Sequence, residues 1–589
     1  MQNSRRWASL RCPALLQHAL FAGLASLGCA ISAPAVAGPL ALTKADTAPT
    51  IIEHANGYTL SQGKLVQFDA LAFDAKGKII AIGSQADVAA ATAKLPAARH
   101  IDMQGKTVLP GLIDAHGHVF SQGELAAQLV LRDSRSLQEA QSMIAAYAKA
   151  NPQRTWLYGF GWNQAVWKLG RFPTAAEIDA VVADKPVWLE RVDGHAGWAN
   201  SKALQLAGIT KDTKDPAGGK IERDAKGNPS GVLVDSAMRL VSKNAPGPTQ
   251  AELRLALDAA MVQLASMGLT SVHDAGVRPE QDALFREYAA AGKLLVRVYG
   301  MISGTGAEFD KLAAKGPLPG MADDHYALRA VKLFSDGALG SRGAALLQPY
   351  ADAAPAKGLL FVDDATMQAQ MRKAMQAGYQ VNVHAIGDGG NRQVLDSFAK
   401  LLPQFKQQDM RHRVEHAQVV DLADIPRFKQ LGIVPSMQPT HATSDKNMAE
   451  QRVGPERIKG AYAWRSFLQQ DSRIACGSDF PIESPNPFWG IHAGVTRQDM
   501  EGKPVAGWYP NQAMSVFEAW RCFTLDAAWA AHQDSKLGSL EVGKWADFIV
   551  TDQDLFTMPT YDIFKMKVLQ TWVGGRQVFA AATKTDKQP

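Results

Sequence analysis

The hydrophobic residues of this chain fall into short apolar runs, separated by segments whose apolar positions recur with helical spacing. Runs of this length with few polar residues are typical of buried β-strands. Eight such strands alternating with helices predict an α/β protein built on a (β/α)8 TIM barrel, whose reacting groups lie at the C-terminal ends of the strands. The predicted barrel strands are residues 108–118, 269–274, 294–302, 330–334, 380–384, 413–416, 433–437 and 473–479.

Partly alternating apolar residues before the first barrel strand and after the last predict a second structure. Residues 51–106 have the pattern of short strands, and residues 537–550 and 568–573 add further strands near the C-terminus. We expect both ends of the chain to form one composite β-sandwich, made of residues 45–107 and 531–580.

The spacing of the strand ends predicts an insertion. His384 and His416 are 32 residues apart, which is about one βα unit at the usual scale of ~30 residues. His118 and Lys332 are 214 residues apart, far more than the intervening units require. We therefore expect a barrel domain over residues 108–530, with a large insertion at about 120–250 on the face where substrates bind.

The first 37 residues have the pattern of a cleavable secretion signal. Arg5, Arg6 and Arg11 precede the apolar stretch 15–31, and small residues up to Ala37 offer a cleavage site. A membrane anchor is the weaker alternative, because polar residues interrupt the stretch. We expect a periplasmic or secreted mature protein, with general secretion, twin-arginine and lipoprotein routes left open.

Removal of this segment changes both the charge and the cysteine count. The formal net charge falls from +5 to +2, too little to favour a nucleic-acid partner. Only Cys476 and Cys522 remain, and we expect them to be buried small apolar residues without a disulfide. No other apolar run could span a bilayer. The expected partner is a small-molecule substrate, and a homodimer is left open.

Two histidines stand at the end of the first predicted barrel strand. His116 and His118 are two residues apart, so an extended backbone points both imidazoles to the same side. Two imidazoles this close suit a divalent metal ion. The alternative is a pair of surface histidines at a strand–loop junction.

A lysine inside another predicted strand is equally unusual. Lys332 lies in the apolar run 330–334, where an unpaired charged side chain is costly to bury. A lowered pKa would leave a neutral amine that can react with carbon dioxide, giving a carbamate that bridges two metals. The alternative is a lysine paired with an acidic residue inside the barrel.

Three more side chains of the type that binds metals end predicted strands. His384 and His416 end two consecutive strands, and Asp479 follows the eighth. A lone histidine at a strand end is more often a core residue, but two of them alongside the His-x-His pair favour ligands. Asp479 could bind a metal and accept a proton from a metal-bound water.

Over residues 57–578 the chain resembles the amidohydrolase superfamily of metal-dependent hydrolases. More narrowly, it resembles amidohydrolase family 3 and the branch that contains N-substituted formamide deformylases. The motifs that carry the resemblance are GLIDAHGH at 111–118, KLFSDGALGSR at 332–342, HAIGD at 384–388, EHAQ at 415–418 and GSD at 477–479.

The resemblance implies a centre with one or two divalent metals, for which zinc is expected. Its implied ligands are His116, His118, Lys332, His384, His416 and Asp479. In this scheme the His-x-His pair binds the more buried metal and the other two histidines bind the more exposed one. Lys332 bridges both as a carbon dioxide-derived carbamate, and Asp479 is also the catalytic base.

Four further residues are candidates for contact with the substrate. His195 lies in the stretch 193–200, which resembles a motif of the same branch, although it could instead bind a loop carbonyl. Trp162 could form an aromatic wall in the insertion or simply pack there. Asp336 and Arg342 follow Lys332 and could order the loop or meet a substrate carboxylate.

These observations predict an exported metal-dependent hydrolase that cleaves a C–N bond outside peptides by a metal-activated hydroxide. A linear amide or an N-acyl or N-formyl compound is the expected substrate. A cyclic amide, an ester or a peptide-like compound is the enzymatic alternative, and a non-catalytic exported binding protein on the same barrel is the other. A carbohydrate-active barrel is disfavoured, because the strand ends lack paired acids.

Overall fold

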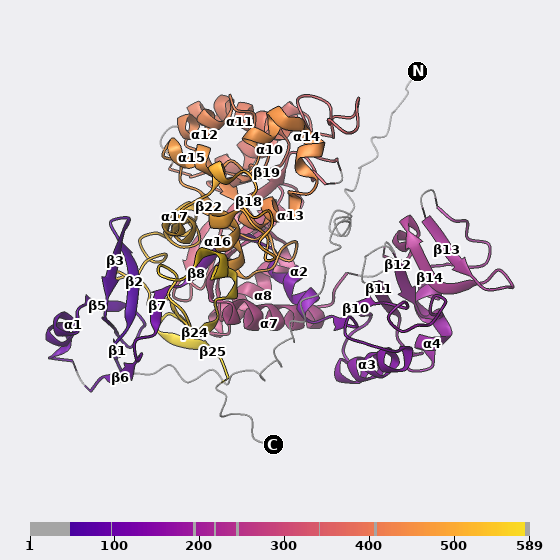
Figure 1. Cartoon of the computed structure of the whole chain (residues 1–589), viewed down its shortest axis with the longest axis horizontal. Coiled ribbons are helices and arrows are strands. Elements are labelled where there is room, and N and C mark those ends of the chain that lie inside the picture. Colours follow the sequence, from indigo (N-terminus) through magenta and orange to yellow (C-terminus); the bar gives the residue numbers. More distant parts are fainter. Residues whose placement is uncertain are drawn as a thin grey trace. The chain divides into compact units, whose positions relative to one another are not determined.

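The computed structural model describes residues 48–582, except for 96, 192–195, 217–218, 243–246, 341 and 406–408. The predicted signal segment 1–37 lies outside the described residues. The chain divides into two compact units, shown in Figure 1. One unit is formed by Glu124–Leu255, and the other by the described residues up to Gly123 and from Ala256 onward.

The larger unit contains a nearly closed parallel sheet of eight strands, which confirms the predicted (β/α)8 barrel (Figure 1). The sheet closes where Gly117, at the end of the first strand, pairs with Phe480 after the eighth. In chain order the barrel strands are β8 (Leu112–Gly117), β15 (Leu269–Val277), β16 (Arg297–Ser303), β18 (Tyr326–Phe334), β19 (Gln380–Ala385), β20 (Arg413–His416), β21 (Val434–Met437) and β22 (Ala475–Cys476). The short strand β17 (Leu318–Met321) pairs with β18 in the antiparallel sense.

Helices lie between the barrel strands, and their apolar faces pack inward. In α11 (Asp388–Leu401), the buried residues Val394, Phe398 and Leu401 recur at a spacing that places them on one face. The other helices of this unit are α2 (Val119–Ala126), α7 (Gln250–Ser266), α8 (Pro279–Ala290), α9 (Ala307–Leu312), α10 (Asp364–Gln376), α12 (Ile425–Leu431), α13 (Pro439–Asp445), α14 (Ala449–Arg457), α15 (Trp464–Gln469), α16 (Pro487–Thr496), α17 (Val516–Cys522) and α18 (Leu525–Ala530).

Two further sheets of this unit bring the ends of the chain together. A four-stranded sheet has the order β5-β4-β1-β6, and a six-stranded sheet has the order β25-β24-β23-β7-β2-β3. Phe548 stacks on Trp572 with ring centroids 5.2 Å apart, and both share a core with Phe73. The elements are β1 (Thr50–Glu53), β2 (Asn56–Ser61), β3 (Lys64–Phe68), β4 (Ala70–Phe73), β5 (Ile79–Gly83), α1 (Gln85–Thr92), β6 (Arg99–Asp102), β7 (Thr107–Pro110), β23 (Phe548–Thr551), β24 (Val568–Val573) and β25 (Arg576–Ala580).

The run predicted as one strand over 108–118 is in fact two strands in different sheets. β7 pairs with β2 and β23, whereas β8 begins the barrel after Gly111. A Cβ atom on Gly111 would lie 2.2 Å from the side chain of Thr270, so only glycine allows the chain to pass there. The predicted strand 473–479 is also shorter, because Asp479 has a φ of +60° and lies in a loop.

The two cysteines of the described chain form a disulfide, which corrects the expectation that they are unpaired. Cys476 ends β22 and Cys522 ends α17, with their Cα atoms 5.1 Å apart. Both residues are buried, as expected. Two cysteines 46 residues apart carry no pairing signal in the sequence, because only the barrel closure brings α17 to the eighth strand.

The smaller unit is built on its own six-stranded sheet, in the order β13-β14-β12-β11-β10-β9. Its core contains Trp162, Trp167 and Trp198, which pack with ring centroids 6.0–6.4 Å apart. The elements are β9 (Leu129–Val130), α3 (Leu137–Ala150), β10 (Leu157–Trp162), α4 (Ala175–Asp179), β11 (Val187–Arg191), β12 (Ala196–Ala199), α5 (Ser201–Leu206), β13 (Gly219–Arg223), β14 (Pro229–Asp235) and α6 (Arg239–Ser242).

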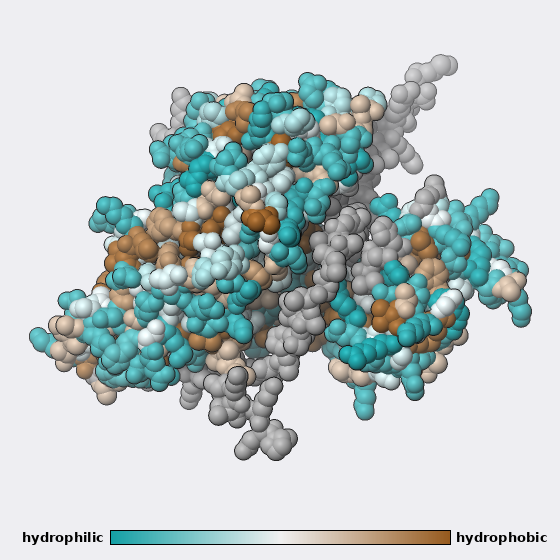
Figure 2. All heavy atoms as spheres, viewed as in Figure 1, coloured by the Kyte–Doolittle hydropathy of each residue, from teal (hydrophilic) through white to brown (hydrophobic). Residues whose placement is uncertain are grey.

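The face of the molecule shown in Figure 2 is mostly hydrophilic, and its apolar residues gather in several separate patches. Within the described part of the chain, no helix combines the length and the hydrophobicity that crossing a bilayer requires.

Candidate metal centre

The ends of the barrel strands bring together the side chains that the sequence singles out. Ligand atoms of His116, His416 and Asp479 all lie within 4.8 Å of one another, and all three residues are buried. A carboxylate oxygen of Asp479 lies 3.6 Å from Nε2 of His116 and 3.2 Å from Nε2 of His118. This group of two imidazoles and a carboxylate is the kind of donor set that holds a divalent metal.

Lys332 and His384 complete the cluster. Nζ of Lys332 lies 2.9 Å from Nε2 of His116, and the ring of His384 lies 4.5 Å from that of His416. Nε2 of His384 is buried and has no hydrogen-bond partner in the described part of the chain. A buried nitrogen without a hydrogen-bond partner is available to a metal ion, and all six predicted residues lie close together at this place.

Hydrogen bonds fix which nitrogen of two histidines faces the cluster. Nδ1 of His116 donates to Glu415 at 2.5 Å, and Nδ1 of His416 donates to Oε1 of Gln438 at 2.7 Å. Because the proton is held on Nδ1 in both rings, each Nε2 keeps its lone pair for a metal.

Burial sets the charge of the amine and the imidazoles. It lowers the pKa of Lys332 to about 8, against the opposing effect of Glu415 and Asp479. It also lowers the pKa of His384 to about 3, helped by the positive charge of Lys332. The imidazole of His384 is therefore neutral at pH 7, and roughly one tenth of the lysine is an unprotonated amine.

Asp479 is ionised despite its burial. Burial alone would raise the pKa of this carboxyl, but the hydrogen bond from His118 and the nearby imidazoles of His116 and His416 hold it well below its usual range. Asp479 therefore carries a negative charge at neutral pH and can either bind a cation or accept a proton.

A buried carboxylate ties the first barrel strand to the loop that carries Asp479. Asp114 accepts hydrogen bonds from the backbone N–H of His116 and from both the backbone N–H and the hydroxyl of Ser478. A Cβ on Gly477 would lie 2.5 Å from the backbone nitrogen of His116, so the loop approaches the strand as closely as glycine permits. His116 and Asp479 are thereby held in one rigid group.

Two of the candidate ligands have strained backbones. His416 has a φ of +76° and Asp479 a φ of +60°, in the left-handed region that residues other than glycine seldom adopt. Strain of this kind is typical of functional sites, where the surrounding contacts hold a side chain in one direction.

Of the four residues predicted to contact substrate, three lie in the described part of the chain, and their contacts there are with other parts of the protein. Asp336 is fully buried and accepts backbone N–H groups of Ala345, Ile386 and Gly387, so it orders the loops after β18 and β19. Arg342 pairs with Asp352.

Trp162 packs in an apolar core. It is fully buried in the core of the smaller unit, and its Nε1 donates to the carbonyl of Leu189. A packing role therefore accounts for this residue. His195 lies outside the described residues.

Three residues of the site had no role in the sequence predictions. Glu415 and Gln438 hold the two histidine tautomers, and His441 lies 3.9 Å from Asp479. A signal for the last two was present. Gln438 and His441 follow the seventh predicted strand. The ends of the second, third and seventh strands carry no candidate ligand, and the seventh lies between strands that do.

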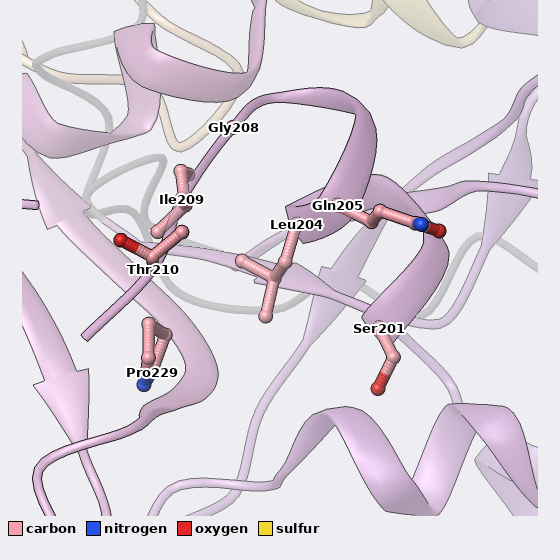
Figure 3. Close-up of a pocket in the computed structure, with 7 residues that line it drawn as sticks. All are labelled: Ser201, Leu204, Gln205, Gly208, Ile209, Thr210 and Pro229. Atoms are coloured by element: carbon pink, nitrogen blue, oxygen red, sulfur yellow. The ribbon is translucent and has the colours of Figure 1, made fainter. Parts of the chain in front are cut away.

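The smaller unit contains a pocket of about 340 Å³, shown in Figure 3. Its lining includes Ser201, Leu204, Gln205 and Ile209, and none of its seven lining residues is charged or of the type that binds metals. The cluster at the barrel strand ends, which does contain residues of that type, is therefore the candidate functional site.

Comparisons with known proteins agree with this geometry. A sequence model described as "Amidohydrolase family" matches residues 99–579. LONG AFTER FAR-RED 3 of Arabidopsis thaliana is 34% identical over 81% of this chain and 83% of the relative. N-substituted formamide deformylase of Arthrobacter pascens is 30% identical over 85% of this chain and 93% of that enzyme.

A solved structure is also similar. An uncharacterised metal-dependent hydrolase from Pyrococcus horikoshii matches with a TM-score of 0.72 and 26% identity, covering 87% of this chain and 99% of that one. The resemblance therefore includes both the barrel and the segments on either side of it.

Proposed function

The chain belongs to the amidohydrolase family, and from this membership we propose that it is a metal-dependent hydrolase that cleaves the C–N bond of a linear amide or N-acyl compound. The observation that carries the proposal is the cluster of His116, His416 and Asp479, with the ionised carboxylate facing the imidazoles. This arrangement offers a cation site and a proton acceptor side by side, which is what amide hydrolysis needs.

The residues present fit a centre of one or two metals, with zinc as the expected ion. His116 and His118 would hold one metal together with Asp479, and His384 and His416 would hold a second. A bound divalent metal lowers the pKa of water and withdraws electron density from the substrate carbonyl. The imidazole-rich donor set suits zinc.

Lys332 would bridge the metals as a carbamate. Its amine is buried among the candidate ligands, and its pKa of about 8 leaves part of it neutral at pH 7. Only a neutral amine can attack carbon dioxide. The resulting carbamate carries a negative charge, which two nearby cations would stabilise.

Asp479 would act as the base. Its low pKa keeps it ready to accept the proton of the attacking water, and it would then pass that proton to the leaving nitrogen. Asp114 and Ser478 would keep the carboxylate in place during both transfers, because they fix the loop that carries it.

An exposed aromatic ring beside the centre supports a substrate with an apolar group. Phe334 is 40% exposed, and its ring lies 5.4 Å from that of His384. The backbone N–H of Phe361, a second partly exposed aromatic residue, donates to the carbonyl of Ser335. One relative is named an N-substituted formamide deformylase, so we take N-formyl amines with an aromatic substituent as the first class to test.

We also propose that the protein is exported to the periplasm and loses residues 1–37. N-terminal sequencing of the protein recovered from the periplasm of its own host should then begin at Gly38. An intact N-terminus in the cytoplasmic fraction would contradict export.

The function is tested with protein purified without chelator and supplied with Zn²⁺. Release of benzylamine from N-formylbenzylamine is measured before chelation, after chelation and after zinc is returned. We expect turnover to be lost after chelation and regained after zinc is returned. Hydrolysis that survives complete metal removal would contradict the proposal. If the protein hydrolyses only cyclic amides or esters, those compounds replace linear amides as the proposed substrate class. If it binds the substrates without any turnover, a non-catalytic binding protein is favoured.

A further inference from the structure

One of the three strand ends that contribute none of the six predicted ligands still directs a histidine at the centre. The seventh barrel strand, β21, ends at Met437, and His441 lies four residues later in α13. The ring of His441 stacks on that of His416 at an interplanar angle of 21° and a centroid distance of 6.0 Å. His441 is therefore in the same layer of side chains as the candidate ligands.

His441 faces one particular oxygen of Asp479. Its Nε2 lies 3.9 Å from Oδ2, whereas His116 and His118 both face Oδ1. The two carboxylate oxygens thus have separate neighbours. Oδ1 points to the pair that would hold the more buried metal, and Oδ2 is left as the oxygen that can carry a proton.

The imidazole of His441 is sheltered and incompletely bonded. Its side chain is only 11% exposed, and Nε2 has no hydrogen-bond partner in the described part of the chain. Buried polar atoms are nearly always paired in folded proteins, and exceptions are concentrated at places where another molecule supplies the partner. The separation of 3.9 Å from Asp479 is too long for a direct hydrogen bond.

We propose that His441 is a further catalytic residue, whose Nε2 accepts a hydrogen bond from the N–H of the leaving nitrogen of the substrate as the C–N bond breaks. This inference rests on the proposed function. Asp479 Oδ2 would deliver the proton to the single lone pair of that nitrogen, so the nitrogen must lie within reach of Oδ2, and Nε2 of His441 is the unpaired nitrogen on that side. Protonation makes the N–H of the leaving nitrogen more acidic, so the hydrogen bond to His441 stabilises the transition state more than the ground state.

Two other roles for His441 make different predictions. If His441 were a metal ligand, replacing it would release metal, as we expect for His416. A purely structural histidine would affect folding and leave the chemistry unchanged. His412 provides a matched control for the structural role, because it is buried, stacks on Phe398 and also has an unpaired Nε2, but precedes β20 instead of following it.

The test compares His441→Ala, His441→Gln, His416→Ala and His412→Gln with the wild type, all as full-length protein loaded with Zn²⁺. Zinc per chain, the midpoint of thermal unfolding, kcat and KM are measured. Two substrates are used, N-formylbenzylamine with a poor leaving group and N-formyl-4-nitroaniline with a good one.

We expect His441→Ala to keep its zinc while kcat for N-formylbenzylamine falls by about 100-fold, with little change in KM. The loss should shrink to less than about tenfold for the nitroaniline, because a good leaving group needs less help. His441→Gln, whose Oε1 can also accept a hydrogen bond, should recover part of the activity. His416→Ala should lose zinc, and His412→Gln should lose only thermal stability.

If the wild type is active but His441→Ala loses zinc, His441 is a metal ligand. That result would overturn this inference and leave the proposed function standing. An equal loss of kcat on both substrates, or no loss, would also overturn it. A wild type that hydrolyses neither formamide would overturn the proposed function, and the assignment to a leaving nitrogen with it.

Discussion

Oε2 of Glu415 lies 2.5 Å from Nδ1 of His116, although 299 residues separate them in the chain. Both side chains are fully buried, and the hydrogen bond leaves Nε2 of His116 as the unprotonated nitrogen. A carboxylate in this position also makes the imidazole a stronger electron donor toward a metal. The most buried candidate ligand of the centre thus depends on a residue from the sixth barrel strand.

Glu415→Gln should weaken zinc binding by about 10- to 100-fold, because the amide holds the Nδ1 proton of His116 less firmly than a carboxylate does. Competition with a chromogenic chelator measures the affinity. Glu252→Gln is a suitable control, since Glu252 is also buried and its side chain accepts hydrogen bonds from Thr249 and Thr155, neither of which is a candidate ligand. Equal zinc affinity in all three proteins would contradict a role for Glu415.

Asp479→Asn should lower kcat by about 10²- to 10⁴-fold, the usual contribution of a catalytic base. An amide can still offer one oxygen to a metal, so we expect most of the zinc to remain. Steady-state kinetics and metal analysis on the same sample separate the two effects. Near-normal turnover in this variant would rule out Asp479 as the base.

The barrel could be predicted from the sequence because its strands are short apolar runs with chemistry at their ends. Lys332, His384 and His416 each end or lie within such a run, and parallel strands bring these ends to one face. The break at Gly111 could not be foreseen, because the residue that forbids a Cβ there, Thr270, is 159 positions away. Contacts of that kind exist only once the fold has formed.

The residues that orient the candidate ligands could not be predicted from the sequence for a similar reason. The roles of Glu415 and Gln438 depend on which nitrogen of a neighbouring histidine they meet, and spacing alone does not determine that. For Trp162 the sequence left a substrate-binding wall and a packing role open, and its side chain is fully buried in the core of the smaller unit.

Phe334→Ala should raise KM for N-formylbenzylamine by about 10-fold and leave kcat nearly unchanged, because the ring lies beside the centre without touching the reacting atoms. Burying an aromatic substituent against a phenyl ring is worth about 1–3 kcal/mol. N-Formylmethylamine, which lacks the aromatic group, should show no such change. The same KM increase for both substrates would exclude Phe334 as the apolar contact.

The Cys476–Cys522 disulfide should stabilise the protein, because it closes a 46-residue segment around the eighth strand. Cys522→Ser, or reduction of the wild type, should lower the free energy of unfolding by about 2–4 kcal/mol. Denaturant unfolding with and without a reductant measures the difference. The Cys476→Ser/Cys522→Ser double variant should match the reduced wild type and be insensitive to reductant, whereas an unchanged midpoint on reduction would contradict the pairing.

If Lys332 forms the proposed carbamate, we expect metal uptake to depend on pH and carbon dioxide. With a pKa lowered by burial to about 8, roughly one tenth of the amine is neutral at pH 7 and about nine tenths at pH 9. The pKa of His384 is about 3 and that of Asp479 is below its usual range, so these groups are already deprotonated across this interval. Carbamate formation should therefore rise with pH between 7 and 9, and zinc uptake by metal-free protein should rise with it.

The measurement is zinc bound per chain after incubation at each pH with a fixed concentration of dissolved carbon dioxide. We expect close to two zinc ions per wild-type chain at pH 9, fewer when carbon dioxide is excluded, and a carbamate carbon in the ¹³C NMR spectrum after labelling with ¹³C-bicarbonate. Lys332→Ala and Lys332→Arg should lose the carbamate signal and bind substantially less zinc. One zinc per chain in wild type and variants alike, independent of pH and carbon dioxide, would reduce Lys332 to a structural residue and leave a mononuclear centre.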